Sequence, residues 1–281
     1  MTAPASTTGR VTLVGGGPGA VDLLTVRAWR ALQAADVVVA DRLGPVEILA
    51  ELPPRVRVVD VGKEPGRHPV PQERINELLV EHALAGAHVV RLKGGDPFVL
   101  GRGGEEVAAC LAAGVPVEVV PGVTSAVAVP GLAGIPLTHR GVTTGFHVVS
   151  GHCAPGSADP APGSSAQEIT PTSDTKGPLD AAALACVRDA TATLVVLMGV
   201  RSLGAIVAQS LAAGADPGTP VAIVENGSTP EQRVTRARLE AAAEVAAARG
   251  VRSPAVVVIG HVAAEGLLEG TSERRLAGAG V

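Results

Sequence analysis

The sequence contains almost no aromatic residues. Phe, Trp and Tyr together make up 1% of its 281 residues, and Tyr is absent. Aromatic rings therefore cannot anchor the core, whose apolar mass comes from Val, Ala and Leu within a hydrophobic content of 46%. That content suffices to bury large sheets and argues against overall disorder. Such a composition suits parallel strands covered by Ala-rich helices.

Cysteines and long apolar runs are also scarce. Cys110, Cys153 and Cys186 are odd in number and widely spaced, so they predict neither a disulfide framework nor a zinc site, and we expect no metal. No segment reaches the roughly 18 consecutive apolar residues of a membrane span. The first ten residues lack the charged-then-apolar order of a signal peptide. We therefore expect a cytoplasmic protein with no membrane partner.

Lysine is rare among the basic residues. Only Lys63, Lys93 and Lys176 contribute to the 23 basic residues, so the other 20 are Arg, and the formal net charge is −4. This charge argues against nucleic acid as a partner and favours a small-molecule site. The guanidinium fork of Arg binds carboxylates in bidentate fashion. A codon bias toward Arg is an alternative explanation of the overall ratio.

Short Val-rich runs alternate with segments of helical length along the chain. This alternation is typical of βα units and predicts an α/β fold with a mostly parallel sheet. Strands are expected at residues 11–15, 36–40, 56–61, 88–92, 115–120, 192–198, 220–225 and 255–260. Helices are expected at residues 23–34, 72–85, 103–113, 179–189, 203–213 and 239–249.

The pattern divides into two α/β domains, joined near residues 131–145. Residues 151–178 interrupt it, because they are rich in Pro, Ser, Gly and Thr and have no apolar period. We expect a disordered tail at 1–10, an N-terminal α/β domain at 11–135, a C-terminal α/β domain at 136–265 with a flexible insertion at about 153–178, and a tail at 266–281. Ligand sites in such folds open at the carboxyl ends of strands.

The first predicted strand ends in a glycine turn, Gly15-Gly16-Gly17-Pro18-Gly19, which leads into a helix. Glycines allow a small ligand to approach the backbone closely. A dinucleotide fingerprint requires G-x-G-x-x-G, but position 20 is Ala, and Pro18 lacks an N–H that could donate to a phosphate. The turn therefore disfavours NAD, while a purely structural turn stays open.

Residues 91–98 (RLKGGDPF) place two glycines and Asp96 at the end of another strand. A carboxylate there can hold the ribose hydroxyls or the amino group of a nucleoside-like ligand. An ordinary Asp-Pro turn is the alternative. Residues 101–106 (GRGGEE) then expose one Arg and two Glu at a helix start. Helix capping explains the two glutamates and leaves Arg102 unexplained.

Two later segments add polar side chains. Residues 120–126 (VPGVTSA) place hydroxyls after a strand, where they can cap the next helix. Residues 134–140 (GIPLTHR) add a His and an Arg at the predicted domain crossing, where His139 alone favours a structural role. The order of the chain supports no Ser-His-Asp arrangement.

With these segments in place, the chain resembles the tetrapyrrole methylase family, and within it the uroporphyrinogen-III methyltransferases. The resemblance covers about residues 10–265. Its carriers are GGGPGAVDLLT (15–25), ADVVVADRL (35–43), GKEPGRH (62–68), QERIN (72–76), VVRLKGGDPFVLGRGGEE (89–106), VVPGVTSA (119–126), AGIPLTHR (133–140), TLVVLMG (193–199), PVAIVENGSTPEQR (220–233) and SPAVVVIG (253–260).

The resemblance implies a two-domain, class III methyltransferase of non-Rossmann type, usually a homodimer. It binds S-adenosylmethionine between its domains and releases S-adenosylhomocysteine. By matching motifs, the cofactor contacts would be Pro18, Gly94, Gly95, Asp96, Thr124, Ser125, Met198, Gly227 and Ala255. The substrate and catalytic candidates would be Asp41, Arg102, Glu105 and Arg140.

The implied reaction is the methylation of uroporphyrinogen III at C2 and then C7, which gives precorrin-2 for sirohaem or cobalamin synthesis. The site has to align a pyrrole carbon behind the methyl group and exclude water. Arg102 and Arg140 would grip the carboxylates of the macrocycle. Asp41 or Glu105 would accept a proton or stabilise charge during attack, and the sequence does not choose between them.

Three positions depart from the family pattern. Ala20 stands where Asp is usual, Ala40 where an aromatic residue is common, and Leu197 where Tyr is frequent. These departures bear on edge contacts and pocket packing more than on the chemistry. A sibling enzyme acting on a later corrin precursor stays open, as does a non-catalytic nucleotide-binding module. Because the sequence ends soon after the last predicted strand, we expect methylation without a dehydrogenase or chelatase domain.

Overall fold

A computed structural model describes residues 8–41, 44–62, 70–152 and 177–268. The chain forms two compact units, one from Met1–Ala128 with Ser228–Pro230, the other from Val129–Gly227 with Glu231–Val281. Each unit contains a five-stranded sheet with helices, so the predicted α/β class is confirmed. The predicted insertion and the two predicted tails lie outside the described residues, apart from a few residues at their edges.

The sheet of the first unit is entirely parallel, in the order β3-β2-β4-β1-β5. All five carboxyl ends therefore lie at one edge of the sheet. The strands are β1 (Arg10–Gly15), β2 (Val37–Ala40), β3 (Arg57–Asp60), β4 (His88–Lys93) and β5 (Val117–Val120). The helical segments are α1 (Val26–Gln33), α2 (Gln72–Leu84), α3 (Gly103–Ala112) and the 3-10 turns Val21–Leu23 and Val46–Glu51.

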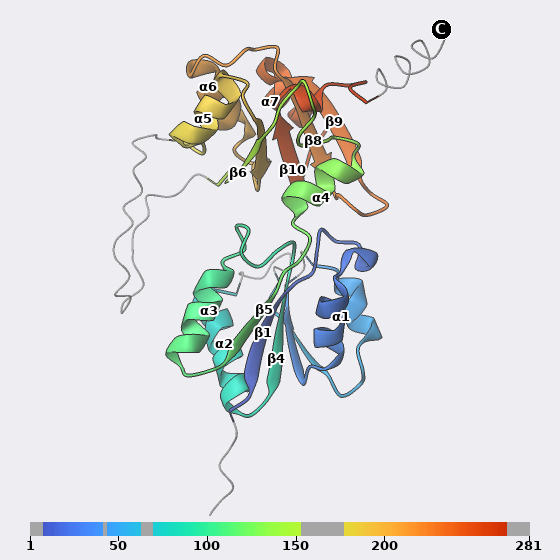
Figure 1. Cartoon of the computed structure of the whole chain (residues 1–281), viewed down its shortest axis with the longest axis vertical. Coiled ribbons are helices and arrows are strands. Elements are labelled where there is room, and N and C mark those ends of the chain that lie inside the picture. Colours follow the sequence, from blue (N-terminus) through green and yellow to red (C-terminus); the bar gives the residue numbers. More distant parts are fainter. Residues whose placement is uncertain (1–7, 42–43, 63–69, 153–176, 269–281) are drawn as a thin grey trace, which may run out of the picture. The chain divides into compact units, whose positions relative to one another are not determined.

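Helices cover both faces of this sheet (Figure 1). Successive strand residues point to opposite faces. Val89 accordingly packs with Leu79 in the core beneath α2 and α3. Val90 points to the opposite face and packs with Leu32 in the core beneath α1. The three central strands β1, β2 and β4 are buried along nearly their whole length, as strands covered on both faces usually are.

The sheet of the second unit has the order β6-β7-β10-β8-β9. Only β6 and β7 are parallel, whereas the other three pairings are antiparallel. The prediction of a mostly parallel sheet is therefore wrong for this unit. The strands are β6 (Phe146–Ser150), β7 (Thr193–Leu197), β8 (Pro220–Glu225), β9 (Arg233–Arg238) and β10 (Ala255–Ile259). The helical segments are α5 (Ala181–Arg188), α6 (Leu203–Ala212), α7 (Ala242–Ala248) and the 3-10 turns Leu239–Ala241 and His261–Ala263.

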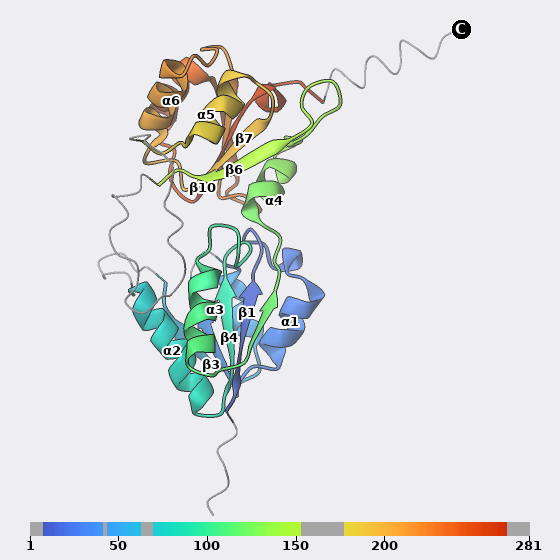
Figure 2. The same ribbon diagram turned by 60° about the vertical axis from the view of Figure 1, so that its left-hand side comes forward.

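One core cluster of the second unit lies on the face of its sheet where α5, α6 and α7 pack against β7, β8 and β10. Figure 2 shows α5 and α6 along this face. One further helix, α4 (Ser125–Leu132), carries the chain from the first unit into the second. Within the described ranges, no helix combines the length and the apolar character needed to cross a membrane.

Candidate functional site

The turn after β1 and the turn after β4 bind each other at the carboxyl edge of the first sheet. Gly17 N donates to Gly95 O at 3.1 Å, and Gly95 N donates to Gly17 O at 2.6 Å. Gly16 N also donates to Lys93 O at 2.7 Å. Gly95 has a φ of +64°, a conformation that favours glycine. The glycine turn around Pro18 and the segment Gly94–Asp96 are therefore neighbours, as the sequence predicts.

The end of β5 approaches the same two turns closely. A Cβ atom added to Gly122 would lie 2.6 Å from Gly15 Cα and would overlap the carbonyl oxygen of Gly95. Backbone atoms line this approach, so no side chain could rotate away to make room. Three strand ends, those of β1, β4 and β5, thus meet through glycine backbone.

Asp96 joins two of these strand ends. Its Oδ2 accepts from Gly122 N at 3.0 Å, and its Oδ1 accepts from Phe98 N at 2.8 Å. The second bond forms the local turn that was the alternative interpretation of this residue. The first bond is long-range, so Asp96 also fixes β4 against β5.

Two hydroxyl residues complete this edge. Ser125 is the first residue of α4, and a Cβ atom at Gly95 would lie 3.5 Å from its Oγ. Thr124 Oγ1 accepts from Ala126 N at 3.3 Å, which supports the predicted capping role. We name Pro18, Gly94, Gly95, Asp96, Thr124 and Ser125 the strand-end cluster. The structure places all six at one edge of one sheet.

The other three predicted cofactor residues gather at one end of the second sheet. Ala255 begins β10, Met198 follows β7, and Gly227 follows Asn226 at the end of β8. Because β10 runs antiparallel to both neighbours, its first residue lies beside the last residues of β7 and β8. Asn226 N donates to Pro254 O at 3.0 Å, which holds these segments together.

Unusual backbone conformations concentrate near the predicted site residues. Six non-glycine residues of the described chain have positive φ, and all but Ala190 lie beside or within the predicted segments: Leu100, Arg102, Met198, Asn226 and Ser228. Such conformations cost on the order of 1–3 kcal/mol each and persist where the surroundings impose them, often at functional sites. This distribution supports a functional role for these turns.

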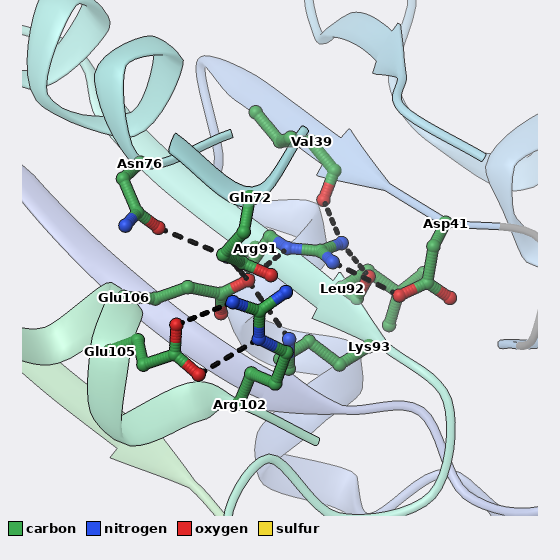
Figure 3. Close-up of polar contacts among 10 residues, drawn as sticks. All are labelled: Val39, Asp41, Gln72, Asn76, Arg91, Leu92, Lys93, Arg102, Glu105 and Glu106. Atoms are coloured by element: carbon green, nitrogen blue, oxygen red, sulfur yellow. Dashed lines mark hydrogen bonds and ion pairs between the residues drawn. The ribbon is translucent and has the colours of Figure 1, made fainter. Parts of the chain in front are cut away.

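Arg102 and Glu105 form a bidentate ion pair at the start of α3, with Nε to Oε1 at 2.8 Å and NH2 to Oε2 at 2.7 Å. Both side chains are about half exposed. They line an open hollow of about 420 Å³ together with the exposed apolar side chains of Phe98 and Leu100. Figure 3 shows the two hydrogen bonds of this pair. The hollow offers a charged group and an apolar wall to a ligand.

Arg140, the second predicted substrate clamp, lies in the second unit. It is exposed on a turn that is closed by a hydrogen bond from His139 N to Thr143 O at 3.0 Å. The structure shows no ion pair between Arg140 and a described residue. His139 takes part in this turn through its backbone, in keeping with the structural role that the sequence favours.

Asp41 follows β2 and pairs with Arg91 of β4, whose NH2 lies 3.0 Å from Asp41 Oδ2. Arg91 is almost completely buried and also donates through Nε to Glu106 at 3.1 Å. Glu106 Oε1 accepts additionally from Lys93 Nζ at 2.9 Å and from Gln72 Nε2 at 3.2 Å. Figure 3 shows these side chains converging from β2, β4, α2 and α3. We name Arg91, Lys93, Gln72 and Glu106 the buried network.

Sequence reasoning missed the buried network. Burial lowers the pKa of Lys93, and nearby Arg91 lowers it further, while the contact with Glu106 opposes both effects. The signal was available in the strand: positions 91 and 93 of a buried, Val-rich strand are both cationic. Alternate residues of a strand share one face. Two cations on one buried face require anionic partners, and the two adjacent glutamates at 105 and 106, at the start of the next predicted helix, were candidates.

A family model for tetrapyrrole (corrin/porphyrin) methylases matches residues 10–243. The chain belongs to this family. A uroporphyrinogen-III C-methyltransferase of Paracoccus denitrificans is 44% identical over 256 residues, which cover 91% of this chain and 82% of that protein. A siroheme synthase of Tolumonas auensis is 43% identical, and the match covers 91% of this chain but only 50% of that longer protein.

A solved structure agrees with these relatives. The crystal structure of uroporphyrin-III C-methyl transferase from Thermus thermophilus, complexed with S-adenyl homocysteine, is 44% identical to this tetrapyrrole methylase. The superposition covers 90% of this chain and 98% of that chain, with a TM-score of 0.69. The predicted family is therefore confirmed.

Proposed function

We propose that this tetrapyrrole methylase is an S-adenosylmethionine-dependent C-methyltransferase that converts uroporphyrinogen III to precorrin-2. Two methylations, at C2 and C7, follow one another. Membership of the family and the relatives of that name support the substrate. The structural observation that carries the proposal is the strand-end cluster, in which three glycine-containing strand ends meet around Asp96. The product feeds sirohaem synthesis, cobalamin synthesis or both.

The described residues fit S-adenosylmethionine chemically. The strand-end cluster combines glycine backbone, a carboxylate and two hydroxyls, which match the ribose hydroxyls and amino group of this cofactor. Met198, Gly227 and Ala255 contribute a second set of contacts from the other sheet.

The cofactor supplies an activated methyl group, so the protein needs to position the acceptor carbon and keep water away. Arg102 and Arg140 bind carboxylates of the macrocycle, because a guanidinium recognises a carboxylate through two parallel hydrogen bonds. The apolar wall formed by Phe98 and Leu100 lies beside Arg102 and accommodates the ring edge. Asp41 or Glu105 accepts the proton that leaves the macrocycle after carbon attack.

Incubation with uroporphyrinogen III and S-adenosylmethionine under reducing conditions tests this function. We expect mass spectrometry to show two added methyl groups in the product. A protein that binds S-adenosylhomocysteine but adds no methyl group to uroporphyrinogen III would contradict the substrate. Methylation of a later corrin precursor in the same assay would identify a sibling activity instead.

We also propose that the enzyme is a cytoplasmic homodimer. The proposal rests on the resemblance to the family and on the few, widely spaced cysteines of the sequence. Burial raises the pKa of the Cys110 thiol to about 11, which suits a buried, unreactive thiol. Light scattering is expected to give twice the mass of one chain, and a monomer at micromolar concentration would contradict the dimer.

A further inference from the structure

Arg91 connects two carboxylates that come from different parts of the first unit. Its Nε donates to Glu106 Oε1 at 3.1 Å, and its NH2 donates to Asp41 Oδ2 at 3.0 Å. Its NH1 donates to the carbonyl oxygens of Val39 at 3.3 Å and Leu92 at 2.7 Å. The guanidinium is therefore held on three sides and has no freedom to follow Asp41 if that side chain moves.

The buried network and Asp41 together contain two cationic side chains and two carboxylates. Arg91 and Lys93 carry two positive charges, and Glu106 and Asp41 can carry two negative charges. Glu106 is fully buried, whereas the side chain of Asp41 is 24% exposed. Of these four charged side chains, Asp41 is the most exposed, so it can contact a bound ligand. The three buried members lie behind it.

We propose that Glu106 and Arg91 are positioning residues that fix the Asp41 carboxylate in place for the reaction. Glu106 anchors the Arg91 guanidinium from α3, Lys93 strengthens that anchor, and Arg91 then orients Asp41 at the carboxyl end of β2. Because Asp41 is its proposed working group, this inference rests on the proposed methyl transfer.

The second carboxylate candidate lacks such support. Glu105 pairs with Arg102 on the surface of α3, and both side chains are about half exposed. An exposed ion pair is screened by solvent and stabilises its geometry less than a buried one. A group that must accept a proton from a defined carbon requires a fixed orientation, which the buried network supplies to Asp41.

The substitution Glu106→Gln tests the negative charge of Glu106 separately from its shape. Oε1 accepts all three hydrogen bonds, while Oε2 accepts none from the described residues. An amide can therefore keep its oxygen at the Oε1 position and place its NH2 group at the Oε2 position, so the shape and the acceptor survive and the negative charge is lost. We expect kcat to fall by roughly tenfold or more, the effect typical of a supporting residue behind a functional group. We expect the KM for uroporphyrinogen III and the affinity for S-adenosylhomocysteine to change less than about twofold.

A double-mutant cycle separates positioning from a structural role. If Glu106 acts through Asp41, adding Glu106→Gln to Asp41→Asn should change kcat by less than about twofold. Effects that multiply would overturn the inference, as would an unchanged kcat in Glu106→Gln or in Asp41→Asn alone. Wild-type protein that transfers no methyl group would instead remove the proposed function, and this inference with it.

Two further variants make the result interpretable. Glu81→Gln removes a carboxylate from an exposed ion pair with Arg74 on α2 and is expected to leave kcat unchanged. Arg91→Lys keeps the positive charge but cannot reach both carboxylates at once, so it should reproduce the loss of kcat. If circular dichroism shows that Glu106→Gln does not fold, Arg91→Lys takes its place in the double-mutant cycle. A normal kcat in folded Arg91→Lys would also overturn the inference.

Discussion

Gly122→Ala is expected to lower the affinity for S-adenosylhomocysteine by about 100-fold or more. The new methyl group would lie 2.6 Å from Gly15 Cα and would overlap the carbonyl oxygen of Gly95, so the ends of β1, β4 and β5 would have to separate. A displacement of about 1 Å in a positioned site can cost about 100-fold. Isothermal titration calorimetry measures the affinity, and thermal unfolding shows whether the variant still folds.

Gly204→Ala provides the matched control for Gly122→Ala. A Cβ atom at Gly204, in α6, would meet no atom within 4 Å. The same substitution there should leave cofactor affinity unchanged and raise stability by roughly 0.4–1 kcal/mol, because it removes glycine from a helix. A folded Gly122→Ala protein with normal affinity would show that the meeting of the three strand ends does not form the cofactor site.

Arg102→Ala is expected to abolish most methyl transfer while cofactor affinity stays normal. A hydrogen-bonded contact with a charged group contributes roughly 1.5–3 kcal/mol, which corresponds to a loss of about 10- to 100-fold in kcat/KM. Arg188→Ala is the matched control, since Arg188 forms a similarly exposed bidentate pair with Asp189 in the other unit. That control should leave kcat/KM unchanged.

Asp96→Ala should give the opposite result. It removes the acceptor for Gly122 N and Phe98 N and a proposed contact with the cofactor. We therefore expect weaker binding of S-adenosylhomocysteine with unchanged binding of uroporphyrinogen III. Loss of cofactor binding in Arg102→Ala, together with unchanged cofactor binding in Asp96→Ala, would reverse the two assignments.

The first unit could be predicted from the sequence in some detail. Its strands are short Val-rich runs bounded by glycine turns, and its helices have clear apolar spacing, so local pattern and global fold agree. The helix predicted at 23–34 was set too early, because Val21–Leu23 forms a separate 3-10 turn and Thr25 caps α1 by accepting from Ala28 N. The glycine and Asp96 motifs were found because they end parallel strands, whose carboxyl ends share one edge.

The second unit was harder to predict because strand direction leaves little trace in composition. β9 was missed since its sequence, RVTRAR, contains three arginines and a single Val, as an edge strand can. β6 was missed since its residues are only partly buried or exposed and its apolar run is short. Helix α4 has no apolar period and contains Pro130, so only the hydroxyl residues at its start indicated a helix.

Some residues of the candidate site could likewise be predicted from the sequence, and others could not. Residues that follow strand ends could be found from motifs, because their positions are set by backbone geometry. The buried network could not be assembled from motifs, because Gln72, Arg91 and Glu106 come from α2, β4 and α3, and only packing brings their side chains together. The pairing of Arg91 with Asp41 depends in turn on the neighbouring register of β2 and β4.

Calorimetric titration of the wild-type protein with S-adenosylhomocysteine tests the central claim most directly, because the strand-end cluster is assigned to this cofactor. We expect saturable binding of one molecule per chain, weakened in Gly122→Ala and normal in Gly204→Ala. Absence of any binding heat with folded wild-type protein, confirmed by equilibrium dialysis, would contradict the claim.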